Sequence, residues 1–317
     1  MASDIHIPVL RERIVELLTP ALSQPGSVCV DATVGLGGHA AAILSACPQA
    51  HLIGIDRDPD ALDLARQRLV SFGDRVHLVR ARYDQLPQIL AGLEIARVQG
   101  VLLDLGLSSL QIDRRERGFA YAVDAPLDMR MSADDPITAA HVVNTYGVER
   151  LATVLRRYGQ ERFASRIANR IVAERQKRPF DTSARLVATI VDAIPAAARH
   201  NGGHPAKRTF QALRIVVNAE LESLSAVLPA AIAALAVGGR IAVLAYHSLE
   251  DRMVKSVLRS ASSDTAPRDL PVVPIGYQAQ LRLLTRGAER PGTEELTRNT
   301  RASSARLRVA ERIEEAA

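Results

Sequence analysis

The sequence places a glycine-rich turn where a cofactor would bind. Residues 30–40 read VDATVGLGGHA, and Gly35, Gly37 and Ala40 match the G-x-G-x-x-[GA] spacing of dinucleotide-binding turns. Glycine accepts positive φ and lets the backbone approach a ligand closely, and a helix that begins at the turn offers free N–H donors. The turn therefore predicts a nucleotide-like cofactor, but alone it does not distinguish one such cofactor from another.

Asp56 stands about twenty residues after these glycines, at the end of the apolar run 51–56. A carboxylate in this place can accept hydrogen bonds from both hydroxyls of a ribose. The competing role is that of a helix N-cap, which Asp58 fills better because Pro59 follows it as a first helical residue. We therefore expect Asp56 to bind a ribose, which nicotinamide cofactors and S-adenosylmethionine both contain.

Two further side chains follow apolar runs of the same kind. Tyr83 comes after the run 75–79, where an aromatic ring can lie against an adenine, although a surface tyrosine fits equally well. Asp104 lies at the end of the run 100–105, at the edge where ligands of open α/β sheets bind. Because an unpaired buried charge is costly, a carboxylate that ends an apolar strand favours a functional role.

The elements that must position these side chains alternate between strands and helices. Short β-rich runs at 27–31, 51–56, 75–79 and 100–105 are separated by segments with helical spacing. This alternation predicts a parallel sheet covered by helices on both faces. The strand pattern resumes at 238–248, and late candidates at 280–285 and 305–311 predict an antiparallel hairpin, which is common in methyltransferases and absent from ordinary dehydrogenases. The predicted fold is α/β, a doubly wound, mostly parallel, Rossmann-like methyltransferase sheet.

Residues 111–225 interrupt this pattern with segments of helical spacing at 158–176, 183–194 and 209–224. We therefore predict a cofactor-binding domain built from residues 1–110 and 226–317, and an inserted, mainly helical subdomain that recognises the substrate.

The apolar stretch 228–246 predicts a helix, a turn at Gly238 and Gly239, and a strand, rather than a membrane span.

Composition and charge bound the class of partner. The chain has 317 residues, 47% of them apolar, which is enough for a sizeable core. Its net charge of +5 divides into −3 in residues 1–110, +5 in 111–225 and +3 in 226–317, which suits a polyanionic partner or a solvated basic surface equally. Cys29 and Cys47 are too few for a metal site, so we expect buried free thiols in a reducing cytoplasm. The N-terminus lacks a signal-peptide pattern, which favours a cytoplasmic protein with no membrane association.

Ten short motifs follow one another in order along nearly the whole chain. They are H-x-P-V-L at 6–10, D-A-T-x-G-x-G-G-H at 31–39, G-I-D-R-D-P at 54–59, D-L-G-x-S-S at 104–109, E-R-G-F at 116–119, P-L-D-M-R-M at 126–131, Y-G-x-E-R at 158–162, H-P-A-K-R-T-F-Q-A-L-R-I at 204–215, N-x-E-L at 218–221 and H-S-L-E-D-R at 247–252. The ordered set resembles the MraW/RsmH family of bacterial small-subunit ribosomal RNA methyltransferases. The resemblance implies methyl transfer from S-adenosylmethionine to the N4 amine of a decoding-region cytosine in 16S ribosomal RNA.

The same resemblance implies which residues hold the cofactor, namely Gly37, Gly38, His39, Asp56, Tyr83, Asp104 and Gln111. The chain departs from the family pattern at three places. Leu110 stands where proline is usual, Tyr246 where phenylalanine is commoner, and residues 299–303 read NTRAS where the family often has N-P-R-x-R-S. None of these departures touches the glycine turn.

Methylation of a cytosine amine makes specific demands, because the nitrogen lone pair is delocalised into the ring. The protein must align the amine with the methyl donor, exclude water and accept the amine proton. The [DNS]-P-P-[YF] motif of many amino-methyltransferases is absent, and DLGLSS occupies its place. The candidate groups are Asp104 or Ser108, with Asp124 and Asp128 as alternative acceptors and His247 as either a further candidate or a structural histidine. No metal motif such as HExxH or CxxC is present, and we expect no metal.

The target base must leave its surroundings to reach the cofactor. Basic residues of the predicted helices are candidates for holding RNA phosphates, although a solvated surface is favoured for any single one; they are Arg156, Arg157, Arg162, Arg166, Arg170, Lys207 and Arg208. We expect 16S ribosomal RNA as the partner, within the small ribosomal subunit, and oligomerisation stays open. The alternatives are a nicotinamide-dependent oxidoreductase and a non-catalytic RNA-binding ribosome assembly factor.

Overall fold

The computed structural model describes residues 8–199, 203–264 and 277–314. The chain divides into two compact units, which we call unit 1 and unit 2. Unit 1 combines Met1–Gly106 with Glu222–Ala317, and unit 2 is Leu107–Leu221. Each unit is described by itself below.

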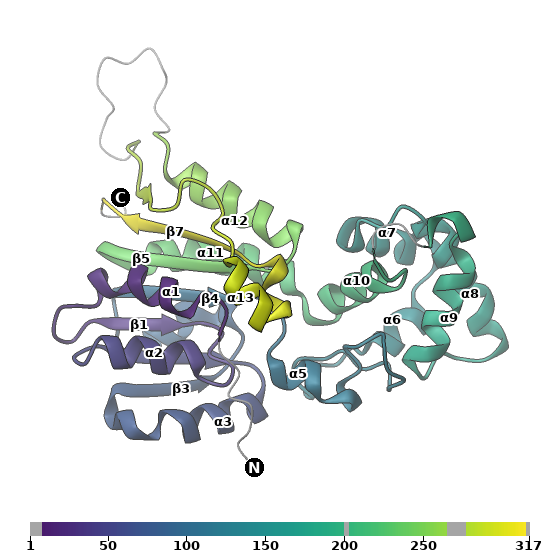
Figure 1. Ribbon diagram of the computed structural model, residues 1–317, viewed down its shortest axis with the longest axis horizontal. Helices are drawn as coiled ribbons and strands as arrows, with labels where there is room; N and C mark the ends of the chain where they lie inside the picture. Colours follow the sequence, from purple (N-terminus) through teal and green to yellow (C-terminus); the bar gives the residue numbers. More distant parts are fainter. Residues whose placement is uncertain (1–7, 200–202, 265–276, 315–317) are drawn as a thin grey trace. The chain divides into compact units, whose positions relative to one another are not determined.

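Unit 1 is built on a sheet of seven strands in the order β3-β2-β1-β4-β5-β7-β6 (Figure 1). The strands are β1 Val28–Asp31, β2 His51–Asp56, β3 Val76–Arg80, β4 Val98–Asp104, β5 Leu235–Ala245, β6 Leu281–Leu283 and β7 Arg306–Arg312. The first five pair in parallel, and β7 runs antiparallel to both β5 and β6. The predicted parallel sheet with a late antiparallel hairpin is confirmed.

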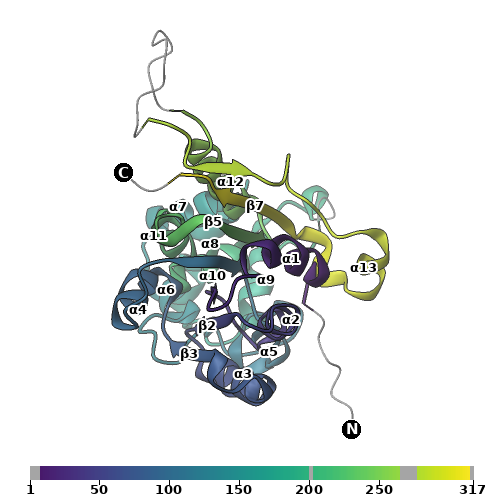
Figure 2. The same ribbon diagram turned by 90° about the vertical axis from the view of Figure 1, so that its left-hand side faces the viewer.

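Helices cover both faces of this sheet, as the sequence predicted. They are α1 Arg11–Leu18, α2 Gly38–Ala46, α3 Pro59–Leu69, α4 Leu86–Gly92, α11 Glu220–Ala234, whose first two residues belong to unit 2, α12 Ser248–Ala261 and α13 Thr293–Arg298. Figure 2 shows α2 and α3 on one side of the sheet, and α4 and α11 on the other. Asp58 caps α3 by accepting the Asp60 N–H, which confirms its predicted role.

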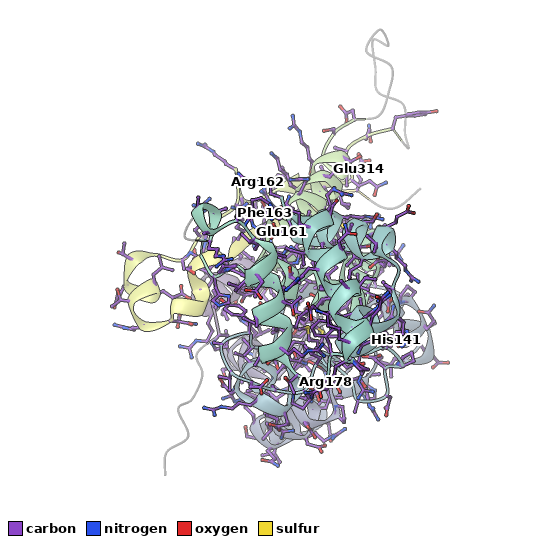
Figure 3. All side chains as sticks on the ribbon, turned by 90° about the vertical axis from the view of Figure 1, so that its right-hand side faces the viewer. His141, Glu161, Arg162, Phe163, Arg178 and Glu314 are labelled. Atoms are coloured by element: carbon purple, nitrogen blue, oxygen red, sulfur yellow. The ribbon has the colours of Figure 1, made fainter. Side chains whose placement is uncertain are left out.

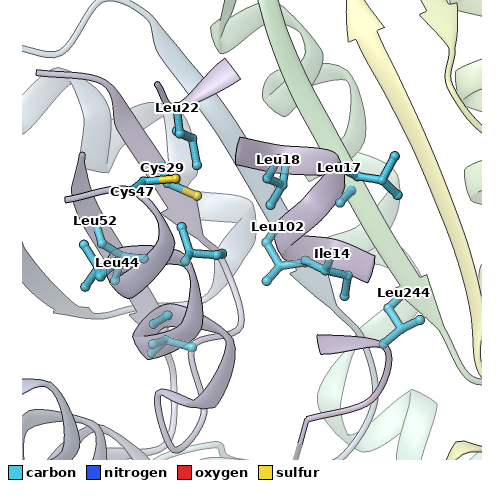
Figure 4. Close-up of a cluster of buried hydrophobic side chains, with 14 of the residues drawn as sticks. Ile14, Leu17, Leu18, Leu22, Cys29, Leu44, Cys47, Leu52, Leu102 and Leu244 are labelled. Carbon is cyan, nitrogen blue, oxygen red and sulfur yellow. The ribbon is translucent and has the colours of Figure 1, made fainter. Parts of the chain in front are cut away.

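One cluster of the unit 1 core lies between the sheet and the helices on one of its faces. Ile14 of α1, Leu44 of α2 and Leu244 of β5 belong to one cluster of buried side chains (Figure 4). Cys29 and Cys47 are buried in this cluster as free thiols, which confirms the expectation from sequence. Burial of this kind, at roughly 25 cal/mol per Å² of apolar surface, fixes the strand ends that carry the polar residues described below.

The predicted turn at Gly238 and Gly239 lies within the segment assigned to β5 rather than between α11 and β5. β5 begins at Leu235, directly after the helix, and its pairing with β4 shifts register between Val98 and Gly100. Gly238 has a φ of 80°, and a Cβ added to Gly239 would lie 2.8 Å from the Ala236 carbonyl oxygen. The two glycines therefore form a bulge within the strand rather than a separate turn before it.

Unit 2 is mainly helical, with α5 Ser109–Asp113, α6 Ala139–Thr145, α7 Val148–Gly159, α8 Ala164–Lys177, α9 Ser183–Ala193 and α10 Lys207–Asn218. Two of the predicted helical segments are each divided. Gln160, with a φ of 51°, separates α7 from α8, and Ala219, with a φ of 50°, separates α10 from α11. Within the described ranges no single helix has the length and mean hydropathy needed to cross a membrane, and only α10 and α11 taken together reach them.

Candidate functional site

Three neighbouring strands of unit 1 end in carboxylates at the same edge of the sheet. Asp31 ends β1, Asp56 ends β2 and Asp104 ends β4. Because β1 pairs in parallel with both other strands, their carboxyl ends lie side by side. The negative charges of Asp104 and Asp56 both act on Asp31 and help to raise its pKa. The edge is therefore a cluster of three acids. Sequence analysis had given no role to one of them, Asp31.

Two of these carboxyl groups are difficult to ionise in the protein alone. Burial is the largest cause, and it raises the pKa of Asp31 to about 7 and that of Asp56 to about 6. Hydrogen bonds from backbone N–H groups and the proximity of His39 oppose this rise without cancelling it. A cationic ligand would favour the ionised forms, because it replaces part of the lost solvation.

The glycine turn is tied to this acidic edge by its own N–H groups. The Gly35 N–H donates to Asp56 Oδ2 at 2.9 Å, and the Gly37 N–H donates to the Val34 carbonyl at 2.7 Å. Both glycines have positive φ, 50° and 76°, which explains why the turn needs them. These two N–H groups are therefore not available to a phosphate. The expectation of free donors concerned the start of the following helix, α2 from Gly38, and it stays a prediction.

His39 lies in the first turn of α2, directly after Gly38. It is buried, and its Nε2 lies 3.4 Å from Asp104 Oδ2. Among the described residues neither ring nitrogen has a hydrogen-bond partner of good geometry. Pro8 packs so closely here that a Cβ on Gly38 would lie 2.4 Å from its Cγ. Pro8 thus packs against the turn, a role that sequence reasoning did not find.

Asp104 is held in place from several directions. The Tyr246 hydroxyl donates to its Oδ1 at 2.9 Å, and its backbone N–H donates to Thr33 Oγ1 at 2.7 Å. Burial and the Asp104 carboxylate raise the pKa of Tyr246 well above 10, so the phenol remains a donor. The Tyr246 ring packs against Gly106, because a Cβ added to Gly106 would lie 3.3 Å from Tyr246 Cδ2. Tyr246 was visible in the sequence only as a departure from a family pattern.

Tyr83 follows the end of β3, whose last residue, Arg80, pairs with Asp56 of β2. It begins the short 3₁₀ turn Tyr83–Gln85 after β3 and is half-buried. The Ala81 N–H donates to the Asp56 carbonyl at 3.0 Å, which fixes the segment that leads to the ring. The structure therefore brings together six of the seven predicted cofactor residues, namely Gly37, Gly38, His39, Asp56, Tyr83 and Asp104, at one edge of one unit.

The remaining candidates in unit 2 have clear local roles. Ser108 and Gln111 form a capping box at α5, in which each side chain accepts the other residue's backbone N–H. Asp128 accepts two hydrogen bonds from the Arg130 guanidinium, at 2.8 and 2.7 Å. Although burial opposes it, this pairing lowers the pKa of Asp128, which makes it a weak proton acceptor. Asp124 accepts the Ala184 N–H at 3.0 Å, and that bond lowers its pKa as well.

His247 caps α12, which supports the structural alternative of its two predicted roles. Its Nδ1 accepts the Glu250 N–H at 3.3 Å, and its Nε2 lies 3.1 Å from Glu250 Oε1. Glu250 in turn accepts the His247 and Tyr246 backbone N–H groups. Asp251 binds Arg306 and Arg308 of β7, at 3.0 and 2.7 Å. The HSLED segment therefore joins α12 to the end of β5 and to β7.

The carboxyl groups at the edge of unit 1 suit one of the two cofactor types better than the other. A nicotinamide dinucleotide carries an anionic pyrophosphate. The carboxyl groups at this edge would repel it in their ionised forms, and the Gly35 and Gly37 N–H groups are already engaged within the protein. S-adenosylmethionine carries a sulfonium and an ammonium, with a ribose whose hydroxyls donate to a carboxylate. The Asp31, Asp56 and Asp104 carboxylates therefore suit the sulfonium nucleoside.

Comparisons with known proteins give the family to which this chain is similar. A family model described as the MraW methylase family matches residues 3–313. Ribosomal RNA small subunit methyltransferase H of Saccharopolyspora erythraea is 59% identical over 315 residues, which covers 99% of this chain and 96% of that protein. The protein of the same name from Frankia alni is 60% identical over 309 residues, with 97% and 95% covered. A solved putative rRNA-methylase from Clostridium thermocellum is 13% identical with a TM-score of 0.45, covering 98% of this chain and all of that one.

Proposed function

The chain belongs to the MraW methylase family, and we propose that it methylates the N4 amine of a decoding-region cytosine in 16S ribosomal RNA. The cofactor is S-adenosylmethionine. The family match over residues 3–313 is the observation that carries the proposal, together with the name shared by relatives that are 56–60% identical. The acidic edge supports methyl transfer over the nicotinamide alternative, because it suits a cationic cofactor.

Unit 1 supplies the residues that would hold the cofactor, which brings a methyl group activated on a sulfonium leaving group. Asp56 would accept the ribose hydroxyls, and Tyr83 would lie against the adenine. Asp104 and Asp31 would face the cationic end, with His39 and the glycine turn closing the site from α2. Gln111, in unit 2, stays a prediction that the family resemblance supports.

The protein's own work on the substrate is positioning and proton transfer. Alignment of the cytosine amine with water excluded can lower the barrier by roughly 7–11 kcal/mol. Among the predicted acceptors, Asp104 is the better candidate, because Ser108 Oγ already accepts the Gln111 N–H in the capping box of α5. Asp128 is paired with Arg130, and His247 is engaged in capping α12, so both are less suited to receive a proton.

We assign substrate recognition to the inserted helical region, residues 111–225. We also propose that the RNA is bound as part of the assembled small ribosomal subunit. The charge of this region and its helical surface support the assignment, because RNA recognition without an aromatic platform depends on phosphate contacts and RNA shape.

One assay tests the function directly. The protein is incubated with methyl-labelled S-adenosylmethionine and small subunits that lack their native methylation, and the label is mapped to a nucleotide and an atom. Label on N4 of a decoding-region cytosine is the expected result. Label elsewhere would replace the proposed substrate, and RNA binding without any label would favour a non-catalytic assembly factor.

A further inference from the structure

Six exposed cations of unit 2 gather where three helices meet. We call them the junction cations: Arg156, Arg157, Arg162, Arg166, Lys207 and Arg208. They come from the end of α7, the linker 160–163, the start of α8 and the start of α10. Within the described part of the chain, none of the six has an acidic partner.

Close packing holds this junction together. A Cβ on Gly159 would lie 2.5 Å from the Arg208 carbonyl oxygen, so the end of α7 rests directly on the start of α10. Gln211 of α10 donates to the Tyr158 carbonyl at 3.0 Å. Arg156 of α7 donates to Ser165 Oγ of α8 at 3.0 Å. The six cations therefore belong to one rigid surface rather than to separate mobile segments.

At the opposite end of α8, the cations have acidic partners. Glu174 lies 3.4 Å from Arg170 and 3.0 Å from Lys177, and Asp181 lies 2.7 Å from Arg178. Figure 3 shows Arg162 and Arg178 at opposite ends of this helical face. Solubility alone does not require that the cations at one end have acidic partners and that those at the other end lack them.

The acid in the linker between α7 and α8 is buried and bonded to the linker backbone, whereas the junction cations are exposed. Glu161, which precedes Arg162 in the Y-G-x-E-R motif, is buried and accepts the Phe163 N–H at 2.8 Å. Lys207 and Arg208 also occupy the first turn of α10, where acids are favoured and cations are repelled by the helix dipole. The junction therefore concentrates positive charge at a cost in stability, which a polyanionic partner would offset.

We propose that the junction cations bind the phosphate backbone of the substrate RNA, and that Arg170 does not belong to this contact. The inference rests on the proposed function for the identity of the polyanion. Exposed guanidinium and ammonium groups that have no acidic partner are the groups that release counterions from a nucleic acid backbone. Arg170, which the sequence had placed in the same set, shares Glu174 with Lys177 and so presents less charge.

Two double variants with the same chemistry test the surface. Arg162→Gln with Lys207→Gln removes one arginine and one lysine from the junction. Lys177→Gln with Arg178→Gln removes the same pair of charges from the opposite end of α8. Binding to small subunits that lack the native methylation is measured at several KCl concentrations. Affinity of the junction variant should fall roughly tenfold, and its slope of log K against log salt should decrease by roughly 1.5, because two phosphate contacts are lost.

The control variant should change neither quantity appreciably. Equal weakening by both variants, or no weakening by the junction variant, would overturn the proposal, because the effect would then depend on net charge or be absent. Calorimetry with S-adenosylhomocysteine should match the wild-type protein for each variant, and thermal melting should show that each variant is folded at the assay temperature. Wild-type methyl transfer with an unaffected junction variant would reject this surface alone, whereas a wild-type protein that neither binds subunits nor transfers methyl would reject the proposed function itself.

Discussion

The carboxyl edge of unit 1 and the helical junction of unit 2 handle charge in opposite ways. Unit 1 carries 22 Lys and Arg against 23 Asp and Glu, and places three carboxylates at adjacent strand ends. Unit 2 carries 18 Lys and Arg against 12 Asp and Glu, and leaves six exposed cations without acidic partners among the described residues. We propose that unit 1 supplies most of the groups that hold the cationic cofactor and that unit 2 contacts the polyanionic substrate, so the changes below should affect one kind of binding and leave the other intact.

Removal of the Asp104 charge should have the largest effect on the cofactor side. In Asp104→Asn the amide can no longer attract a cationic group, and a hydrogen bond to a charged acceptor is typically worth about 1.5–3 kcal/mol. Affinity for S-adenosylhomocysteine, measured by calorimetry, should fall roughly 10- to 150-fold. Subunit binding should be unchanged. An unchanged methyl-transfer rate would remove Asp104 from the site.

A smaller effect is expected from Tyr246→Phe, which restores the residue commoner in the family and deletes the donor to Asp104 Oδ1. Loss of one such hydrogen bond should lower cofactor affinity about 2- to 12-fold. Tyr277→Phe, at a residue that is 48% exposed, is the matched control and should have no effect. If both variants bind the cofactor equally well, Tyr246 does not position Asp104.

The acidic edge should also make cofactor affinity depend on pH. The pKa of Asp56 is about 6 in the protein alone, so its carboxyl is largely protonated at pH 5.5 and ionised at pH 7.5. If only the ionised form accepts the ribose hydroxyls, affinity should rise roughly 4-fold between these values from Asp56 alone. Because the folded pKa exceeds the unfolded value, the free protein should lose stability as pH rises from about 4 to about 6. Calorimetry and thermal melting across this range measure both effects, and a flat affinity profile would contradict the assignment.

The smallest effect on cofactor binding is expected at Asp58, two residues after Asp56. Asp58→Ala removes the N-cap of α3 and should lower the free energy of unfolding by about 0.5–2 kcal/mol. Affinity for S-adenosylhomocysteine should stay near the wild-type value at temperatures where the protein is folded. Chemical denaturation and calorimetry separate the two effects. A loss of affinity as large as that in an Asp56→Ala variant would mean that the two acids share one function.

The sequence by itself determined the order of the elements and the strand ends that carry Asp56 and Asp104. Apolar runs that alternate with helical spacing have few stable arrangements other than a covered parallel sheet, and parallel strands bring their carboxyl ends to one edge. The roles of Asp58 as a cap and of Cys29 and Cys47 as buried thiols follow from local signals of the same kind.

Only the tertiary structure decided which groups are free and which are already engaged. Gly35, Asp128 and His247 each looked available in sequence, yet their partners are Asp56, Arg130 and Glu250. The hydrogen bond from Tyr246 to Asp104 joins residues 142 positions apart. Such pairings depend on distances between elements, which periodicity does not encode. For the same reason, only the structure distinguishes the junction cations, which lack acidic partners among the described residues, from the cations at the far end of α8, which have them.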